Sequence, residues 1–407
     1  MPSSVGKVTL FLATGLLEEG FSVEVYCAAC PRGLHGDYVL YNPRKWCQAG
    51  GGGEWCKRLP DTDIVVSGFT HPERFAHMAR RRGVDTVLAY ATPYVSPGTE
   101  FNKAVTSLGK PSVVYAISEV LTLQPGPAMS VVSYSVLSAP TRFVIDTFLR
   151  ALRLRYDGVG SLPVVVAPHG VPETMYNPGV CPARPARVTK LGFLAKNHMR
   201  KDALSFLLTV ARLVNEGARV EPLLYMVDAV TEPVWRARDL VEIVESMTGV
   251  DLMRRGGVDV LNEHLSKIGL TEEEVTKLYC KMDVLVFPSL GEAFGLPPLE
   301  AVLLGRPAIA TAHPAIAEIW GETMPMARCR PVFIGTAHLC APDQDTLYKA
   351  VLSTITDPEK TWRREYERAK RYTYRKMVKE IIRAIDTAIR DPDPIKNKLT
   401  PIHKEAL

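Results

Sequence analysis

Two glutamates stand eight residues apart in the C-terminal half of the chain, with a short loop sequence between them. Glu292 and Glu300 bracket AFGLPPL, where Pro297 and Pro298 predict the start of a helix because proline fits the first helical turn. Amides at a helix N-terminus bind anions, phosphate above all. Those amides belong to Ala293, Phe294, Gly295 and Leu296. Carboxylates repel phosphate but accept hydrogen bonds from hydroxyls, so a phosphate flanked by hydroxylated rings, as in a nucleotide-sugar, fits this stretch.

The same stretch resembles the E-x7-E signature of retaining glycosyltransferase family 4 and its relatives, which have the GT-B fold. The resemblance implies that Glu300 accepts hydrogen bonds from the ribose hydroxyls of a donor. It also implies that Glu292 lies at the sugar hydroxyls on the reacting side, and that the loop amides hold the sugar and the diphosphate. Residues 303–311, LLGRPAIAT, are similar to the family's next strand. On spacing alone, the alternative is an exposed Glu292 and a helix-surface Glu300 that bind nothing.

Positive charge comes from a second stretch. Residues 191–208, LGFLAKNHMRKDALSFLL, resemble the first strand and helix of the family's donor domain, where a Lys and an Arg neutralise the leaving diphosphate. Lys201 matches that Lys, but Ala195 stands where the Arg is expected. We expect Lys196 or Arg200 to supply the second charge, although lysine lacks the bidentate fork of arginine.

Two histidines are candidates in the N-terminal half. Residues 166–179, VAPHGVPETMYNPG, resemble the family's interdomain segment, and His169 there is predicted to be a turn residue rather than a catalyst. The histidine that the family often carries after an N-domain strand is absent, because residues 117–119 are Ile-Ser-Glu. His71 is the nearby candidate for a role at the sugar, with a plain loop histidine as the alternative.

The elements that must position these residues follow an alternating pattern of short apolar runs and helical stretches, which is typical of an α/β protein with parallel sheets. One series predicts strands at 22–26, 63–67, 86–90, 112–117, 130–135 and 164–167, with a helix at 141–154. The second predicts strands at 188–193, 220–226, 284–287 and 308–311, and helices at 202–216, 240–247 and 298–304. We therefore expect two Rossmann-like domains that face each other across a cleft, the GT-B arrangement.

The predicted join lies in the Pro- and Gly-rich stretch 168–187. Residues 1–168 would form the acceptor-side domain and residues 169–357 the nucleotide-sugar donor domain. A helical segment at 358–390 and a frayed tail at 391–407 would follow. The family's first strand has no counterpart, since the chain begins with a helical pattern. A late start codon, a truncated domain or recruitment of residues 8–12 as a strand would each account for that difference.

Composition narrows the class of protein. The chain has 407 residues, so two domains are expected, and its formal net charge of +5 is spread along the sequence, which argues against a nucleic-acid-binding protein. We find no apolar run long enough to span a membrane and no secretory signal, so we expect a cytoplasmic protein. The basic block 360–379 is predicted to be a solvated helix face, with weak association with an anionic membrane surface as the alternative.

The eight cysteines leave three alternatives open. Cys27, Cys30, Cys47 and Cys56 could hold zinc, although the last two are spaced too widely for a standard zinc motif. Disulfides would fit a hyperthermophilic source, because its intracellular proteins are rich in them. Without a secretory signal, unlinked thiols are our expectation.

Together these observations favour a retaining glycosyltransferase that uses a nucleotide-sugar and needs neither a metal nor a cofactor. The acceptor, whether a saccharide, a lipid-linked group or a small molecule, stays open. The first alternative is a nucleotide-sugar-binding protein without catalysis. A nicotinamide-dependent oxidoreductase would need a GxGxxG after a strand, which the sequence lacks.

Overall fold

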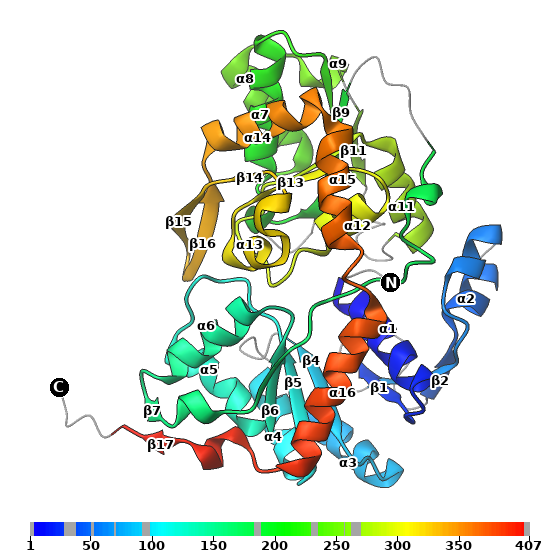
Figure 1. Cartoon of the computed structure of the whole chain (residues 1–407), viewed down its shortest axis with the longest axis vertical. Helices are drawn as coiled ribbons and strands as arrows, with labels where there is room; N and C mark the ends of the chain where they lie inside the picture. The colour runs from blue at the N-terminus through cyan, green and yellow to red at the C-terminus, as the bar shows by residue number, and fades with distance from the viewer. Residues whose placement is uncertain are drawn as a thin grey trace. The chain divides into compact units, whose positions relative to one another are not determined.

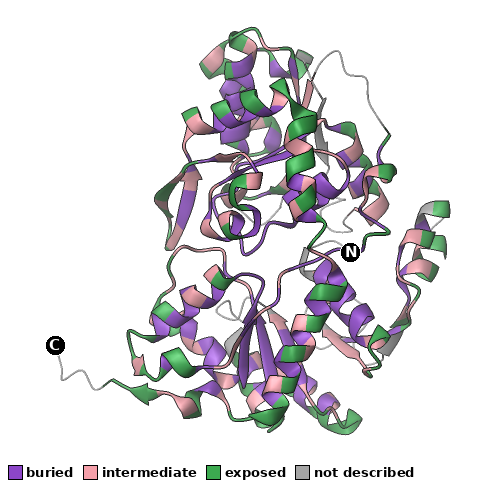
Figure 2. Cartoon of the chain, viewed as in Figure 1, coloured by how far each residue is buried: buried purple, intermediate pink, exposed green. Residues whose placement is uncertain are grey.

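The computed structural model describes residues 4–27, 38–49, 53–68, 71–91, 98–182, 189–228, 235–255, 257–261 and 270–402 (Figure 1). The chain divides into two compact units. The C-terminal unit comprises residues 175–372 together with 119–121 and 1–6. The N-terminal unit comprises residues 7–118, 122–174 and 373–407. In both units the buried residues gather in the strands and on the helix faces that cover them (Figure 2).

The C-terminal unit is built on a six-stranded sheet with the order β11-β10-β9-β12-β13-β14, in which neighbouring strands are parallel. β9, the first of these strands in the chain, lies between β10 and β12, so the strand order reverses at β9. Loops that follow two strands at such a reversal lie side by side and form the usual ligand site of an open α/β sheet. The strands are β9 (Thr189–Asn197), β10 (Val220–Asp228), β11 (Gly257–Leu261), β12 (Val284–Phe287), β13 (Ala308–Thr311) and β14 (Met326–Ala327).

Helices cover this sheet through apolar faces. Helix α7 buries Phe206, Leu207 and Val210 in the same core as Leu191 and Phe193 of β9. Its amphipathic sequence explains the packing, because residues three and four apart lie on one helix face. The helices are α7 (Ala203–Asn215), α8 (Ala237–Thr248), α9 (Leu252–Arg255), α11 (Glu272–Lys281), α12 (Leu296–Leu303), α13 (Pro314–Trp320), α14 (Gln344–Thr356) and α15 (Pro358–Ala369). An antiparallel hairpin, β15 (Cys329–Ile334) and β16 (Ala337–Pro342), precedes α14.

Among the described residues, the N-terminal unit contains two larger sheets, with the orders β1-β3-β2 and β4-β5-β6-β8, and the small pair of β7 (Tyr156–Asp157) with β17 (Thr400–Pro401). The strands of the two larger sheets are β1 (Glu24–Cys27), β2 (Tyr38–Tyr41), β3 (Ile64–Gly68), β4 (Val87–Ala91), β5 (Ser112–Ala116), β6 (Val136–Ala139) and β8 (Val164–Val166). Residues 8–12 do not form a strand. They lie inside helix α1 (Ser4–Glu18), where Val8, Phe11 and Leu12 are buried on the spacing of one helix face.

The predicted strand at 130–135 is also wrong. Residues Met129–Ser133 form the 3₁₀ helix η2, and β6 begins only at Val136. Side chains satisfy backbone carbonyl groups of this turn: Asn102 Nδ2 donates to Ser130 O at 2.9 Å, and Ser130 Oγ donates to Pro127 O at 2.8 Å. Such side-chain bonds to the backbone compete with a strand ladder. The other helices of this unit are α2 (Pro43–Ala49), α3 (Pro72–Arg82), α4 (Gly98–Ser107), α5 (Pro125–Ala128), α6 (Arg142–Leu152) and α16 (Tyr374–Arg390).

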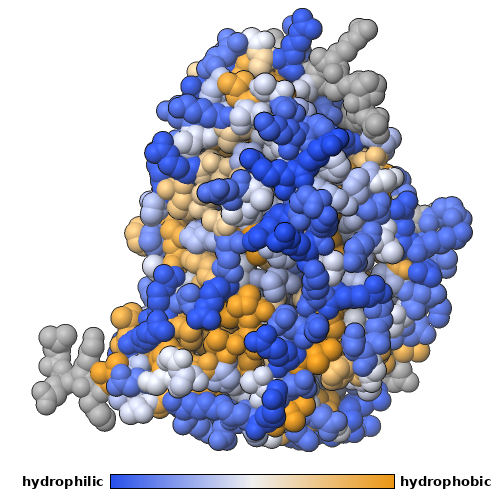
Figure 3. All heavy atoms as spheres, in the orientation of Figure 1, coloured by the Kyte–Doolittle hydropathy of each residue, from blue (hydrophilic) through white to orange (hydrophobic). Residues whose placement is uncertain are grey.

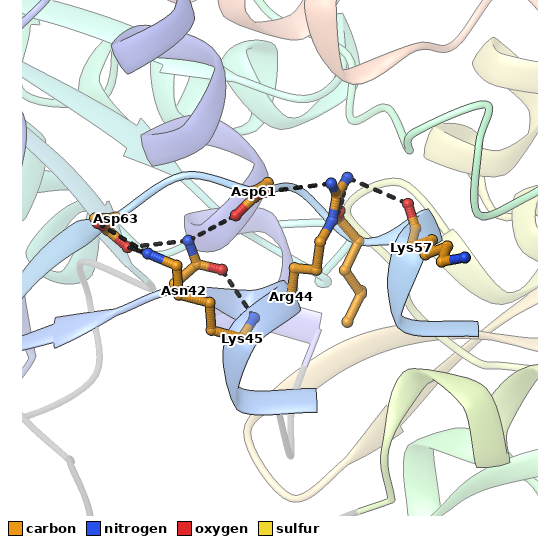
Figure 4. A network of polar contacts seen from close by, with 7 residues as sticks. Asn42, Arg44, Lys45, Lys57, Asp61 and Asp63 are labelled. Carbon is orange, nitrogen blue, oxygen red and sulfur yellow. Dashed lines mark hydrogen bonds and ion pairs between the residues drawn. The ribbon is translucent and has the colours of Figure 1, made fainter. Parts of the chain in front are cut away.

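A polar network closes the segment between β2 and β3 (Figure 4). Asn42 Nδ2 donates to Asp61 Oδ1 at 3.0 Å and to Asp63 Oδ1 at 2.9 Å. The Arg44 guanidinium donates to Leu59 O at 2.9 Å and to the Asp61 carboxylate at 3.3 Å. The network stabilises the turn that carries the chain from α2 back into β3.

In the part of the chain that the structure describes, three disulfides overturn the expectation of unlinked thiols for the cysteines involved: Cys47–Cys56, Cys181–Cys280 and Cys329–Cys340. Cys47 and Cys56 therefore pair with each other instead of serving as zinc ligands. Cys181 and Cys280 are 99 residues apart in the sequence, yet their Cα atoms lie 5.1 Å apart. Spacing in the sequence cannot reveal such a pair. Cys30 lies outside the described residues, so its state stays open.

The C-terminal helical segment is split between the two units, and the expected tail is ordered up to residue 402. Helix α15 belongs to the C-terminal unit, whereas α16 packs on β5, β6 and β8 of the N-terminal unit. A Cβ on Gly170 would lie 2.2 Å from the backbone of Thr373, so α16 begins where only glycine permits the approach. Ile395 is fully buried, and Thr400–Pro401 pairs with Tyr156–Asp157. The frayed tail is therefore wrong for residues 391–402, because Ile395 provides an apolar anchor.

The basic block spans the end of α15 and the start of α16. Its charged side chains at Arg363, Arg364 and Lys370 are exposed, as predicted for a solvated face. Hydrophilic side chains lie over α15 in the surface view (Figure 3). Glu365, by contrast, is fully buried and accepts a hydrogen bond from Ala308 N at 3.0 Å. Within the part of the chain that the structure describes, none of the helices combines the length and apolar character needed to cross a membrane.

Glu365 should make the protein's stability fall as the pH rises. Burial raises the pKa of Glu365 well above its usual value. Below the pKa of the unfolded chain the carboxyl is protonated in both states. Between the pKa of the unfolded chain and the higher pKa of the folded protein, the unfolded chain alone releases the proton, so the free energy of unfolding falls as the pH rises. The total loss is roughly 1.4 kcal/mol for each unit by which the two pKa values differ. Glu365→Gln should therefore raise the melting temperature at pH 7 more than at pH 4. An equal change at both pH values would contradict this.

Candidate functional site

The loop between β12 and α12 requires glycine at two positions. Gly295 has a φ of +89°, the left-handed region, and a Cβ there would lie 2.4 Å from Ile316 Cδ1. A Cβ on Gly291 would lie 2.3 Å from Glu119 O. Helix α12 starts at Leu296 with prolines in its first turn, as the sequence predicts. The tight backbone places Glu292 just before the helix N-terminus and Glu300 inside the helix.

The loop after β9 lies against this first loop. Leu290 N donates to Arg200 O at 2.7 Å, which joins the two loops at the strand-order reversal. Asp202 adopts a φ of +54°, and its side chain caps α7 by accepting from Ser205 N at 3.2 Å. A non-glycine residue in this conformation stores backbone strain, which is common where a loop must present neighbouring side chains to a ligand. The neighbours here are Arg200 and Lys201.

Glu292 collects three donors on one oxygen. Its Oε1 accepts from Lys201 Nζ at 2.5 Å and from Arg200 Nη1 at 2.9 Å. Ser289 Oγ also donates to Oε1, at 2.6 Å. Burial by itself raises the pKa of Glu292, but Lys201 and Arg200 outweigh it and lower the pKa to about 2. The carboxylate is therefore ionised at neutral pH and 8% exposed, so the alternative of an exposed Glu292 is wrong.

Arg200 and Lys201 are themselves largely buried. The Arg200 guanidinium also donates to Gly291 O at 2.5 Å, and its Nη2 lies 2.7 Å from Glu119 Oε1. Glu119 comes from the stretch where the family resemblance would place a histidine, and it packs with the C-terminal unit. Burial lowers the pKa of the Lys201 ammonium, while Glu292 opposes that shift. Lys196 is exposed at the end of β9, so Arg200 is the residue that joins Lys201 at Glu292.

Glu300 lies inside the unit instead of on a helix surface. The residue is 3% exposed, and its Oε2 accepts from Tyr279 Oη of α11 at 2.9 Å. Tyr176 lies next to this pair: its hydroxyl donates to Glu272 Oε2 at 2.7 Å. Burial, together with Glu272 and Glu300, raises the pKa of Tyr176 well above its usual value. Two tyrosines that sequence reasoning missed therefore belong to the surroundings of Glu300.

His313 is a further residue that the sequence analysis missed. It follows β13, is fully buried, and caps α13 with Nδ1, which accepts from Ala315 N at 3.3 Å. Burial is the main cause that lowers the pKa of His313 to about 4, with Glu292 and Arg200 close enough to contribute. The imidazole is therefore neutral at pH 7. The signal that could have identified this residue is the His-Pro pair that follows the strand predicted at 308–311.

The remaining predicted site residues are placed as follows. Ala293, Phe294 and Leu296 are buried around Gly295 at the N-terminus of α12, and the role of their amides stays a prediction. His169 is buried in the N-terminal unit, with Nδ1 2.8 Å from Tyr115 Oη, and burial lowers its pKa to about 3. His71 is exposed directly before α3, so its contact with the sugar also stays a prediction.

Comparison with known proteins finds a family model that is similar to the sheet domain of the C-terminal unit. Residues 189–357 match the model of the family described as Glycosyl transferases group 1. A curated relative, an MMP α-(1→4)-mannosyltransferase of Mycolicibacterium hassiacum, is 33% identical over 96 residues. That match spans 24% of this chain and 21% of the relative, so this chain aligns with about a fifth of that enzyme.

Solved structures show the fold of the whole chain. A glycosyltransferase of Rickettsia africae is similar with a TM-score of 0.64 at 12% identity, over 96% of this chain and 97% of the other. The Anabaena protein HepE, solved with UDP and glucose, is similar with a TM-score of 0.61 at 14% identity, over 95% and 97% of the two chains. These likenesses show the GT-B fold, and residues 189–357 are similar to the group 1 glycosyltransferase model.

Proposed function

Because residues 189–357 match the group 1 glycosyltransferase model, we propose that the protein transfers a sugar from a nucleotide-sugar to an acceptor with retention of anomeric configuration. The observation that carries the proposal is the convergence of Lys201 and Arg200 on Glu292, at the N-terminus of a helix that also holds Glu300. Retention is inferred from the E-x7-E resemblance. The acceptor, a saccharide, a lipid-linked group or a small molecule, is left open.

The proposed reaction needs positive charge at the leaving group. When the bond between the sugar and the diphosphate breaks, negative charge develops on the diphosphate, and fixed cations lower the barrier. Lys201 has three N–H donors and Arg200 has five, so both can hold Glu292 and still donate to phosphate oxygens. In this proposal Lys201 and Arg200 neutralise the diphosphate, which is why we assign no metal to the reaction.

Glu292 and Glu300 would recognise hydroxyls at opposite ends of the donor. Glu292 is held ionised by two cations, so it can accept hydrogen bonds from sugar hydroxyls on the reacting side. Glu300 would accept them from the ribose. The amides of Gly295 and Leu296 at the start of α12 would face the phosphates between them. The complex of the Anabaena protein with UDP and glucose supports a donor of this chemical class.

We further propose that the protein works in the cytoplasm. Three disulfides then require a source whose intracellular proteins are oxidised, as in hyperthermophiles.

A thermal-shift screen against UDP-, GDP- and ADP-sugars tests the function. One donor at about 100 times its dissociation constant should stabilise the protein by roughly 2.7 kcal/mol. Product from that donor and a panel of acceptors should then keep the anomeric configuration, measured by NMR. Binding without transfer or donor hydrolysis would favour a nucleotide-sugar-binding protein without catalysis. If none of the donors binds, the proposed function is wrong.

A further inference from the structure

The carboxylate of Glu300 is held by a phenol from another helix. Tyr279 is 1% exposed, and its hydroxyl donates to Glu300 Oε2 at 2.9 Å. Glu300 is 3% exposed, so little water reaches this carboxylate. A buried charge needs hydrogen-bond donors, and a bond to a charged group is worth about twice a neutral one. The Tyr279 hydroxyl therefore helps to hold one of the two carboxylate oxygens in place.

Helix α11, which carries Tyr279, is anchored at both ends. At its N-terminus Thr271 and Glu274 form a capping box, with Thr271 Oγ1 accepting from Glu274 N at 3.2 Å. At its C-terminus Cys280, the residue after Tyr279, is bonded to Cys181. The Arg306 guanidinium donates to Cys280 O at 3.3 Å as well. Tyr279 thus stands on a rigid support, which is what precise placement of a second side chain requires.

We propose that Tyr279 is a positioning residue that orients Glu300 toward the ribose hydroxyls of the donor nucleotide. The proposal rests on the proposed function. Each carboxylate oxygen has two lone pairs, so Glu300 can accept hydroxyls in addition to the Tyr279 bond. A glutamate already fixed in one rotamer loses less conformational entropy when it binds the ribose.

A purely structural tyrosine would behave differently. Its loss would lower the stability of the fold and weaken every ligand of the unit alike. Losing a positioning residue would instead weaken the binding of those ligands whose hydroxyls donate to Glu300. Nucleotides with and without ribose hydroxyls therefore separate the two roles.

The experiment measures binding of UDP, GDP and ADP, and of the 2′,3′-dideoxy form of each, by calorimetry. The proteins compared are the wild type, Tyr279→Phe, Tyr279→Met and Glu300→Gln. Methionine provides a second variant without the hydroxyl, because its flexible side chain fills irregular space. Tyr134→Phe is the matched control: Tyr134 is equally buried, and its hydroxyl donates to Asn102 Oδ1 at 2.6 Å in the N-terminal unit.

We expect Tyr279→Phe and Tyr279→Met to bind the ribonucleotide about tenfold more weakly and to bind the dideoxy form like the wild type. Tyr134→Phe should change neither affinity. Equal weakening of both forms, or no weakening of either, would overturn the role of Tyr279. Should Glu300→Gln lose affinity while the Tyr279 variants keep it, only this inference fails. A wild type that binds none of the diphosphates overturns the proposed function and the inference with it.

Discussion

Replacing Lys201 by alanine should reduce kcat by on the order of a hundredfold or more, the usual cost of removing one group that stabilises developing charge. The substitution removes the ammonium that lies 2.5 Å from Glu292 Oε1 and that we assign to the leaving diphosphate. Glu292 would keep its ion pair with Arg200 in this variant. Initial rates of donor turnover at saturating donor provide the measurement.

Two controls accompany this substitution. Lys190→Ala removes a lysine at the other end of β9, where Nζ lies 3.7 Å from the Glu221 carboxylate, and should leave the rate unchanged. Lys201→Arg keeps the charge and should restore part of the rate, because the guanidinium differs from the ammonium in shape and donor geometry. Melting curves identify variants that have lost the fold. A folded Lys201→Ala protein with the wild-type rate would remove Lys201 from the mechanism.

Glu300→Gln should clearly reduce the stabilisation that the donor confers on the wild type. The amide has the size of the carboxylate and can still accept from Tyr279, so the fold should persist. It lacks the negative charge that makes a hydrogen bond from ribose strong, and losing such a bond costs about 1.5–3 kcal/mol, roughly ten- to a hundredfold in affinity. Melting temperatures with and without the donor measure the effect.

Glu365→Gln is the matched control for Glu300→Gln. Both residues are buried glutamates of the C-terminal unit, but Glu365 bonds the amide of Ala308 and has no place in the proposed site. Its variant should bind the donor like the wild type. An unchanged donor shift in Glu300→Gln would mean that the ribose lies elsewhere, and the site would then need a new assignment.

Local patterns predicted the framework of the site correctly. The apolar run at 284–287, the Gly-containing loop and the paired prolines indicated a strand, a turn and a helix, and the structure has β12, the loop and α12 there. These features can be predicted from the sequence because the apolar pattern of a buried strand, the conformational freedom of glycine and the geometry of proline are local properties of the chain. The helical pattern at the start of the chain is local in the same way, and the structure has helix α1 there, without the strand at residues 8–12 that the sequence left open.

Features that depend on distant residues were missed or mistaken. The tail prediction failed because Ile395 becomes buried only once Tyr134 O accepts its amide at 2.7 Å, a contact across 261 residues by number (395 minus 134). The thiol prediction failed in the same way at Cys181 and Cys280. In both cases the residues nearby in the sequence do not indicate which distant residue is the partner.

The sequence by itself determined the class of fold and indicated the type of ligand that we propose, because strand periodicity, the loop glycines and the two glutamates are encoded within short windows. Only the tertiary structure decided which charges meet. It brought Arg200 rather than Lys196 to Glu292, and it set Tyr279 against Glu300. The physical reason is that the partner of a side chain depends on the order of the strands in the sheet and on which loops meet where that order reverses. No single stretch of sequence contains this information.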